Sequence, residues 1–130
     1  MSDAILRVGG STAGIHAFLK RTALKPHRVY LRGEPMSPGS VIVSRRSYFL
    51  VAVSRASDGD FAKQTRAATR FVRQHMRDLK ALPRHKLHAV IDFGVYDTRT
   101  KQSPLLSWRF PVGLLKLFAA AAIESEISVL

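Results

Sequence analysis

The sequence predicts an α+β fold: a two-layer sandwich with a largely antiparallel sheet and helices on one face. Short segments with apolar residues at alternate positions are interspersed with longer segments whose apolar residues recur at every third or fourth position. The resulting element order is β-α-β-β-α-β-β-α-β. The chain has 130 residues, 46% of them hydrophobic and 23% charged, which is typical of one globular domain. We therefore expect residues 1–130 to form a single α+β domain.

The first predicted strand covers residues 4–8 and ends at Gly9, after which Ser11 or Thr12 is expected to cap a helix. The buried stripe of that helix is expected to consist of Ile15, Phe18 and Leu19. In residues 27–32, apolar positions alternate with Arg28, Tyr30 and Arg32, which predicts a half-exposed strand.

Residues 33–40 contain two prolines and two glycines, so we expect a loop there. A strand over residues 48–54 follows, and then a turn at residues 57–60 that offers helix caps. The longest helix is expected over residues 61–82, because Pro83 would stop it.

Residues 87–96 give the strongest strand signal, because their apolar side chains alternate from Leu87 to Val95. After a polar turn, residues 105–110 are expected to form a further strand that pairs with them as a hairpin and places Trp108 in the core. Pro111 suits the first position of the last helix, where its missing N–H costs nothing. A strand over residues 124–130 is expected to complete the sheet.

The predicted long helix carries six basic residues and one acidic residue, Asp78, between positions 63 and 80. On a helix that turns about 100° per residue, these basic side chains fall in one stripe, and Phe61, Val72, Met76 and Leu79 fall on another side and are expected to be buried. Like charges at such spacings repel by a few tenths of a kcal/mol per pair. The basic side chains therefore either face water or bind an anionic partner. We name the set the basic stripe: Lys63, Arg66, Arg70, Arg73, Arg77 and Lys80.

Lysine and arginine number 21 against 9 aspartates and glutamates, a net charge of +12. This excess favours anionic partners, although an arginine-rich proteome would give the same balance. The first hypothesis is a non-enzymatic interaction domain that binds an acidic protein through the basic stripe. The alternative is non-specific nucleic-acid binding through phosphate contacts, since the stripe has no interleaved aromatic residues for stacking on bases.

The chain contains no cysteine, which excludes disulfides and thiolate metal sites. Its most apolar segment, residues 110–123, is shorter than the roughly 20 residues of a membrane span. The first residues lack the pattern of a signal peptide. These features predict a cytoplasmic protein without a membrane span, and they leave the oligomeric state open.

Three other patterns bear on a phosphate-binding loop, a metal site and a catalytic serine, and a structural role is favoured for each. "VGGSTAG", residues 8–14, lies between a strand and a helix but lacks the order of a phosphate or dinucleotide loop, so a turn with a helix cap is favoured. His85 and His88 are three residues apart, and Asp92 shares a strand face with His88, but a loop that runs into a strand does not supply the preformed geometry of a metal site. No serine lies in a nucleophile elbow. We therefore expect no catalytic residues, no metal and no cofactor.

The segment "FLKRTALKPHRVYLRGEP", with Leu24, Pro26, Gly33 and Glu34, resembles the bacterial domain-of-unknown-function family numbered 4279. The closing segment "FPVGLLKLFAAAAIESEISVL" is similar to the end of that family's domain. The resemblance implies a compact α+β domain, and some members are thought to act as immunity proteins in toxin systems. The sequence departs from the family in "SYFLVAVS", where a tryptophan is often found, and in its basic helix. An inhibitor of a nuclease would be expected to be acidic, which the net charge of +12 contradicts.

Overall fold

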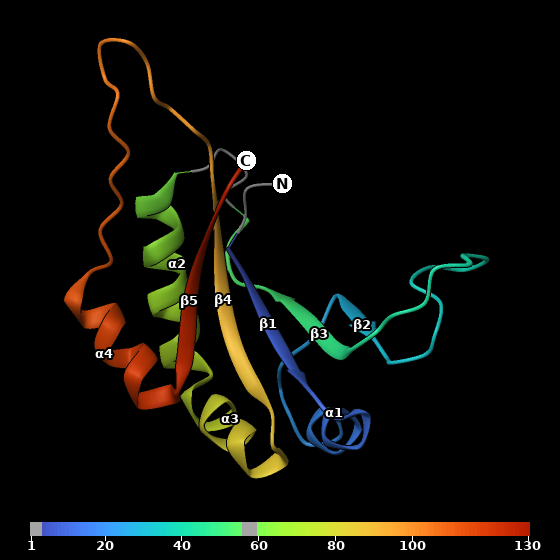
Figure 1. Ribbon diagram of the computed structural model, residues 1–130. Coiled ribbons are helices and arrows are strands. Elements are labelled where there is room, and N and C mark those ends of the chain that lie inside the picture. The colour runs from blue at the N-terminus through green and yellow to red at the C-terminus, as the bar shows by residue number, and fades with distance from the viewer. Residues whose placement is uncertain (1–3, 56–59) are drawn as a thin grey trace.

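The computed structural model describes residues 4–55 and 60–130. Over these residues the chain forms an α+β fold, in which helices pack on one face of a five-stranded mixed sheet (Figure 1). This confirms the predicted two-layer sandwich. The strands are β1 (Ala4–Gly10), β2 (Arg28–Tyr30), β3 (Ser47–Ala52), β4 (His88–Val95) and β5 (Ile123–Val129). The helices are α1 (Thr12–Leu19), α2 (Phe61–Gln74), α3 (Met76–Ala81), the 3-10 helix η1 (Leu82–His85) and α4 (Val112–Ala121).

The sheet has the strand order β2-β3-β1-β4-β5, with β1 at its centre. β1 is antiparallel to both β3 and β4, and β2 is antiparallel to β3. Only β4 and β5 are parallel among the described strands, and α4 lies in the connection between them. The sheet is therefore largely antiparallel, as predicted.

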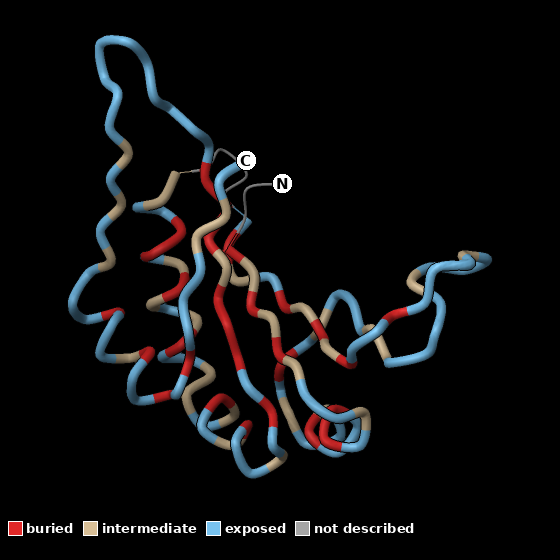
Figure 2. Tube along the Cα trace, in the orientation of Figure 1, coloured by how far each residue is buried: buried red, intermediate tan, exposed pale blue. Residues whose placement is uncertain are grey.

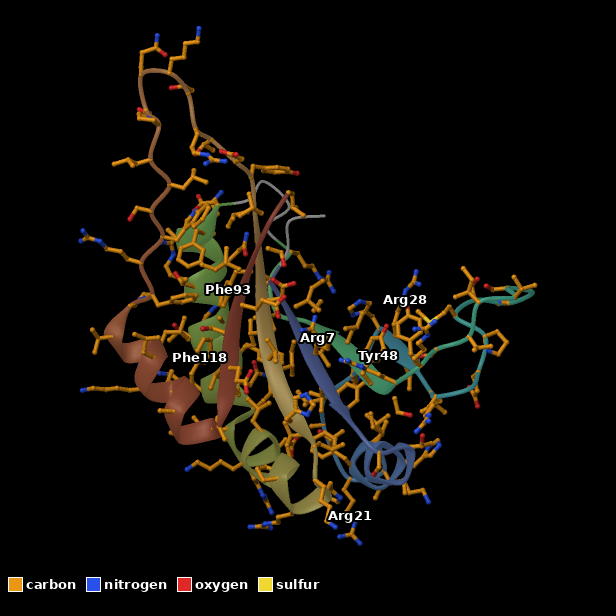
Figure 3. All side chains as sticks on the ribbon, in the orientation of Figure 1. Arg7, Arg21, Arg28, Tyr48, Phe93 and Phe118 are labelled. Carbon is orange, nitrogen blue, oxygen red and sulfur yellow. The ribbon has the colours of Figure 1, made fainter. Side chains whose placement is uncertain are left out.

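The core lies between the helices and one face of the sheet (Figure 2). Leu6, Phe49 and Ile91 point into it from the three middle strands and are fully buried. Phe93 and Phe118 meet there from β4 and α4, with ring centroids 6.4 Å apart (Figure 3). Phe18 of α1 stacks on Phe49 at 5.9 Å, so α1 covers the same face as α2 and α4. The opposite face of the sheet has no helix from the described residues over it.

The prediction of a strand over residues 105–110 is wrong, because these residues form no strand. This segment belongs to a long irregular excursion between β4 and α4 that leaves the sheet (Figure 1). A hairpin with β4 is excluded because β1 and β5 already occupy both edges of that strand. Phe110 alone returns to the core, with its ring centroid 5.3 Å from that of Phe93. Trp108 is half-buried rather than part of the core.

The prediction of one continuous helix over residues 61–82 is also wrong, because the segment forms two helices, α2 and α3. α2 ends at Gln74, and His75 leaves helical geometry with φ −109° and ψ 16° before α3 begins. The carboxylate of Asp78 accepts hydrogen bonds from the Thr22 hydroxyl at 2.9 Å and the Ala23 N–H at 3.0 Å. These contacts tie α3 to the segment after α1, so tertiary contacts fix the direction of α3.

Residues 33–44, predicted as a loop in their first part, form a hairpin-like arm that projects beyond the sheet (Figure 1). Pro35 and Val43 form a β-bridge, and the Met36 N–H donates to the Ile42 carbonyl at 2.9 Å. Gly39 has φ +78°, a conformation that favours glycine at the turn. Across the two described ranges, no helix is long and apolar enough to span a membrane.

Candidate functional site

All six side chains of the basic stripe are exposed. Val72 and Leu79 are fully buried, whereas Phe61 and Met76 are half-buried against the core, so the two sides of the helical segment separate as expected. Asp60 caps α2 by accepting a hydrogen bond from the Lys63 N–H at 3.1 Å. The break at His75 leaves Arg77 and Lys80 on α3, so the stripe follows two helices.

A shallow groove of about 410 Å³ runs along the part of the stripe on α2. It is lined by Lys63, Arg66 and Arg70 and, from the segment after β3, by Arg55. Within the described residues, Arg66 and Arg70 have no ion pair with a carboxylate. Sequence reasoning missed Arg55, because only the fold brings the end of β3 beside α2.

A second basic surface lies on the other side of the sheet, which we call the open face. Strand register places side chains from all five strands on it, alternating with the core positions. Arg7, Arg28 and Tyr48 lie there on the neighbouring strands β1, β2 and β3 (Figure 3). The open face is composed of Ile5, Arg7, Gly9, Arg28, Tyr30, Tyr48, Leu50, Ala52, His88, Val90, Asp92, Gly94, Glu124, Glu126 and Ser128.

A cleft of about 750 Å³ extends from this face to the start of α1. Its lining includes the turn from Gly9 to Thr12, and four arginines, one histidine and one tyrosine gather around it. Three of the arginines have no ion pair within residues 4–55 and 60–130, and the fourth, Arg7, pairs with Glu126. We name this site the basic cleft, with the side chains Arg7, Arg32, Arg45, Arg46, Tyr48 and His88.

Two buried serines position the arginines of the basic cleft. The Ser47 hydroxyl accepts a hydrogen bond from the Arg32 N–H at 3.0 Å and also bonds to the Thr12 hydroxyl. The Ser44 hydroxyl donates to the Arg46 carbonyl, which fixes the turn before β3. Because the backbone is held in this way, Arg32, Arg45 and Arg46 are exposed around one cleft.

An aromatic pair lies beside the basic cleft. The rings of Tyr30 and Tyr48, from the adjacent strands β2 and β3, have centroids 4.9 Å apart and planes tilted by 31°. Both side chains are half-buried. Arg28 donates to the Tyr30 hydroxyl at 3.0 Å, and this hydrogen bond raises the pKa of Arg28 above its usual value. The open face thus combines guanidinium groups with aromatic rings, which the basic stripe does not.

The β4–β5 half of the open face is acidic. Glu124 and Glu126 are exposed on β5, and Asp92 of β4 accepts a hydrogen bond from the Ser128 hydroxyl at 2.8 Å. The ion pair between Arg7 and Glu126, at 3.0 Å, crosses from the basic half to the acidic half. An anionic ligand is therefore favoured over β1, β2 and β3 and repelled from β5.

The histidines and glycines considered from the sequence have separate roles. His85 packs edge-on against Phe18, whereas His88 lies on the open face over Gly9. Ser11 caps α1 by accepting a hydrogen bond from the Gly14 N–H at 3.0 Å, which confirms the predicted turn and cap.

The alternation of Arg28, Tyr30 and Arg32 in the sequence indicated exposed basic and aromatic side chains on one strand. Nothing in the sequence indicated that Arg45 and Arg46 lie near Arg32, because that depends on the pairing of β2 with β3.

The sequence matches no family model and no curated protein, and the structure matches no solved structure. The resemblance to the family numbered 4279 therefore stays a prediction.

Proposed function

We propose that the protein is a non-enzymatic, cytoplasmic module that binds nucleic acid through the basic cleft. The observation that carries this proposal is the gathering of four arginines from β1, from the end of β2 and from the turn before β3 around one concave site. Guanidinium groups bind phosphate oxygens in a planar, two-pronged geometry. Arg32, Arg45 and Arg46 have no carboxylate partner within the described residues, so phosphates that bind between them would offset their mutual repulsion.

The adjacent tyrosines favour nucleic acid over an acidic protein. Tyr30 and Tyr48 offer half-buried rings next to Arg28 and the basic cleft, and bases stack on such rings. Carboxylates on a protein surface would use the arginines but not the rings. The concave cleft also suits a flexible chain of phosphates better than a convex protein surface.

Fluorescence anisotropy with labelled oligonucleotides at low salt tests this proposal. We expect Arg32→Gln/Arg45→Gln/Arg46→Gln to lower the affinity about tenfold or more. The matched control, Arg66→Gln/Arg70→Gln/Arg73→Gln, removes the same charge from α2 and is expected to retain most of the affinity. Failure of the unaltered protein to bind any oligonucleotide, or equal losses in both variants, would contradict the proposal.

A second candidate function is binding of an acidic protein through the basic stripe. The specific observation in its favour is the groove in which Arg55 joins Lys63, Arg66 and Arg70 along α2. If the resemblance to the family numbered 4279 holds, a toxin is one class of such a partner. Capture from a host lysate should then yield one acidic protein that Arg66→Glu/Arg70→Glu/Arg73→Glu/Arg77→Glu no longer retains. Retention of the same protein by this variant would exclude the stripe as the contact.

A further inference from the structure

One row of the open face contains three rings from different strands. Strand register places Tyr30, Tyr48, Gly9 and His88 side by side across β2, β3, β1 and β4. The two tyrosine rings contact each other, and both Tyr48 and His88 line the basic cleft. Tyr30, Tyr48 and Gly9 of the row therefore lie on the positively charged strands β2, β3 and β1, and His88 lies beside them at the start of β4.

Gly9, which has no side chain, lies between Tyr48 and His88 in this row. A Cβ atom at Gly9 would lie 3.5 Å from His88 Cε1, so the imidazole leans over the bare backbone of β1. No side chain rises between Tyr48 and His88 on the strand that separates them. The surface of the row is thus formed by the Tyr48 ring and by the His88 imidazole, which covers Gly9.

Arginines flank this row on both sides. In the register of the sheet, Arg28 and Arg7 lie one step to one side of the tyrosines. Arg32 and Arg46 lie to the other side, at the end of β2 and the start of β3. Such an arrangement offers aromatic surface to bases and guanidinium groups to the phosphates that connect them.

We propose that the ligand of the basic cleft is single-stranded nucleic acid, whose unpaired bases stack on Tyr48 and its neighbours Tyr30 and His88. This inference rests on the proposed function and specifies its ligand. The bases of a duplex are stacked on one another and expose only their edges in the grooves, so a duplex cannot use the rings. The acidic residues of β5 repel the strand from that edge of the sheet, which leaves β1, β2, β3 and the first residue of β4 for binding.

The test compares three labelled ligands of about 12 nucleotides, a length within the range of small single-strand sites. They are an oligothymidylate, its duplex with oligoadenylate, and an abasic oligonucleotide with the same number of phosphates. We expect the unaltered protein to bind the oligothymidylate roughly tenfold or more tightly than either of the others. This comparison needs no variant, so it does not depend on how a substitution affects folding.

Tyr48→Leu then locates the stacking site, because it removes the ring and keeps an apolar side chain. It should lower affinity for the oligothymidylate roughly tenfold and leave affinity for the abasic ligand unchanged. Tyr96→Leu is the matched control, since Tyr96 is 47% exposed and follows β4 outside the row. Tyr30→Leu provides a second probe of the same pair if Tyr48→Leu does not fold.

The outcomes separate this inference from the proposed function. Equal affinity of the unaltered protein for the three ligands would overturn stacking while leaving phosphate binding through the basic cleft intact. Equal losses in Tyr48→Leu and Tyr96→Leu would overturn the assignment to this row. No binding to any of the ligands would overturn both proposals.

Discussion

Gly14 shows how closely α1 packs against the chain before β4. A Cβ atom there would lie 2.5 Å from the His85 carbonyl oxygen, a distance that a side chain cannot occupy without movement of the backbone. Gly10 is constrained in the same way by the Lys86 carbonyl oxygen, which would lie 2.9 Å from a Cβ atom. The glycines of this turn therefore permit close packing, and through it they fix the position of this part of the cleft lining.

Substitution of the two helical glycines Gly14 and Gly113 by alanine should consequently change the free energy of unfolding differently. We expect Gly14→Ala to lower the free energy of unfolding by about 1–3 kcal/mol through overpacking. Gly113→Ala in α4 meets no atom within 4 Å and should be neutral or raise it by about 0.5 kcal/mol. Urea denaturation measures both, and a Gly14→Ala variant as stable as the unaltered protein would show that α1 does not pack as described.

Asp97 provides a titration test of the excursion after β4. Hydrogen bonds and the charge of Arg99 lower the pKa of Asp97 to about 2 from 3.8. The stabilising interaction between the Asp97 carboxylate and Arg99 is therefore fully present above pH 3.8, and it is lost as the pH falls toward 2 and the carboxylate is protonated. NMR titration of the Asp97 carboxyl group should show this midpoint, and Arg99→Gln should return it toward 3.8. Lys101→Gln is the control, and a shift equal to that of Arg99→Gln would contradict a specific contact.

At the level of elements, β4 anchors the fold. It pairs with β1 on one side and β5 on the other, and Ile91 in its middle is fully buried. Ile91→Ala should therefore lower the free energy of unfolding by about 2–5 kcal/mol in urea denaturation. Val129→Ala on the edge strand β5, at a side chain that is 50% exposed, should cost less than about 0.5 kcal/mol. A loss below about 0.5 kcal/mol for Ile91→Ala would contradict the interior position of β4 in the sheet.

The basic stripe should be dispensable for folding. Its cations face solvent, so changing Arg66, Arg70, Arg73 and Arg77 to glutamine removes repulsion without removing core contacts. We expect the free energy of unfolding to change by less than about 0.5 kcal/mol. Asp60→Ala is the positive control, because loss of the cap of α2 should cost about 1 kcal/mol. A loss of several kcal/mol in the glutamine variant would mean that these arginines support the fold.

The elements that local patterns specify were predictable, and those that depend on distant partners were not. Alternation in residues 87–96 identified β4, and the apolar spacing around Val72 identified the inner side of α2. Residues 105–110 have an equally apolar composition, but β1 and β5 already occupy both edges of β4, the strand with which they were expected to pair. No local sequence pattern predicted the break at His75, after which Asp78 of α3 accepts a hydrogen bond from Thr22, far away in the sequence.

At the scale of the whole molecule, ten of the 21 lysines and arginines lie on two surfaces on opposite sides of the sheet, six in the basic stripe and four in the basic cleft. The sequence predicted the basic stripe because its residues lie on one helical segment. It did not predict the basic cleft, because Arg7, Arg32 and Arg46 come from three separate segments that meet only when β1, β2 and β3 pair. Tyr30 and Tyr48 lie beside the arginines of the cleft, and they are the reason for proposing nucleic-acid binding on that side.

The salt dependence of oligonucleotide binding tests this assignment most directly. Each phosphate contact on a single strand contributes about −0.7 to the slope of log affinity against log salt. Arg32→Gln/Arg45→Gln/Arg46→Gln should reduce the magnitude of the slope by about two. The control with equal loss of charge, Arg66→Gln/Arg70→Gln/Arg73→Gln, should leave it unchanged. A slope that falls in the control and persists in the cleft variant would place the phosphates on α2 and contradict the account.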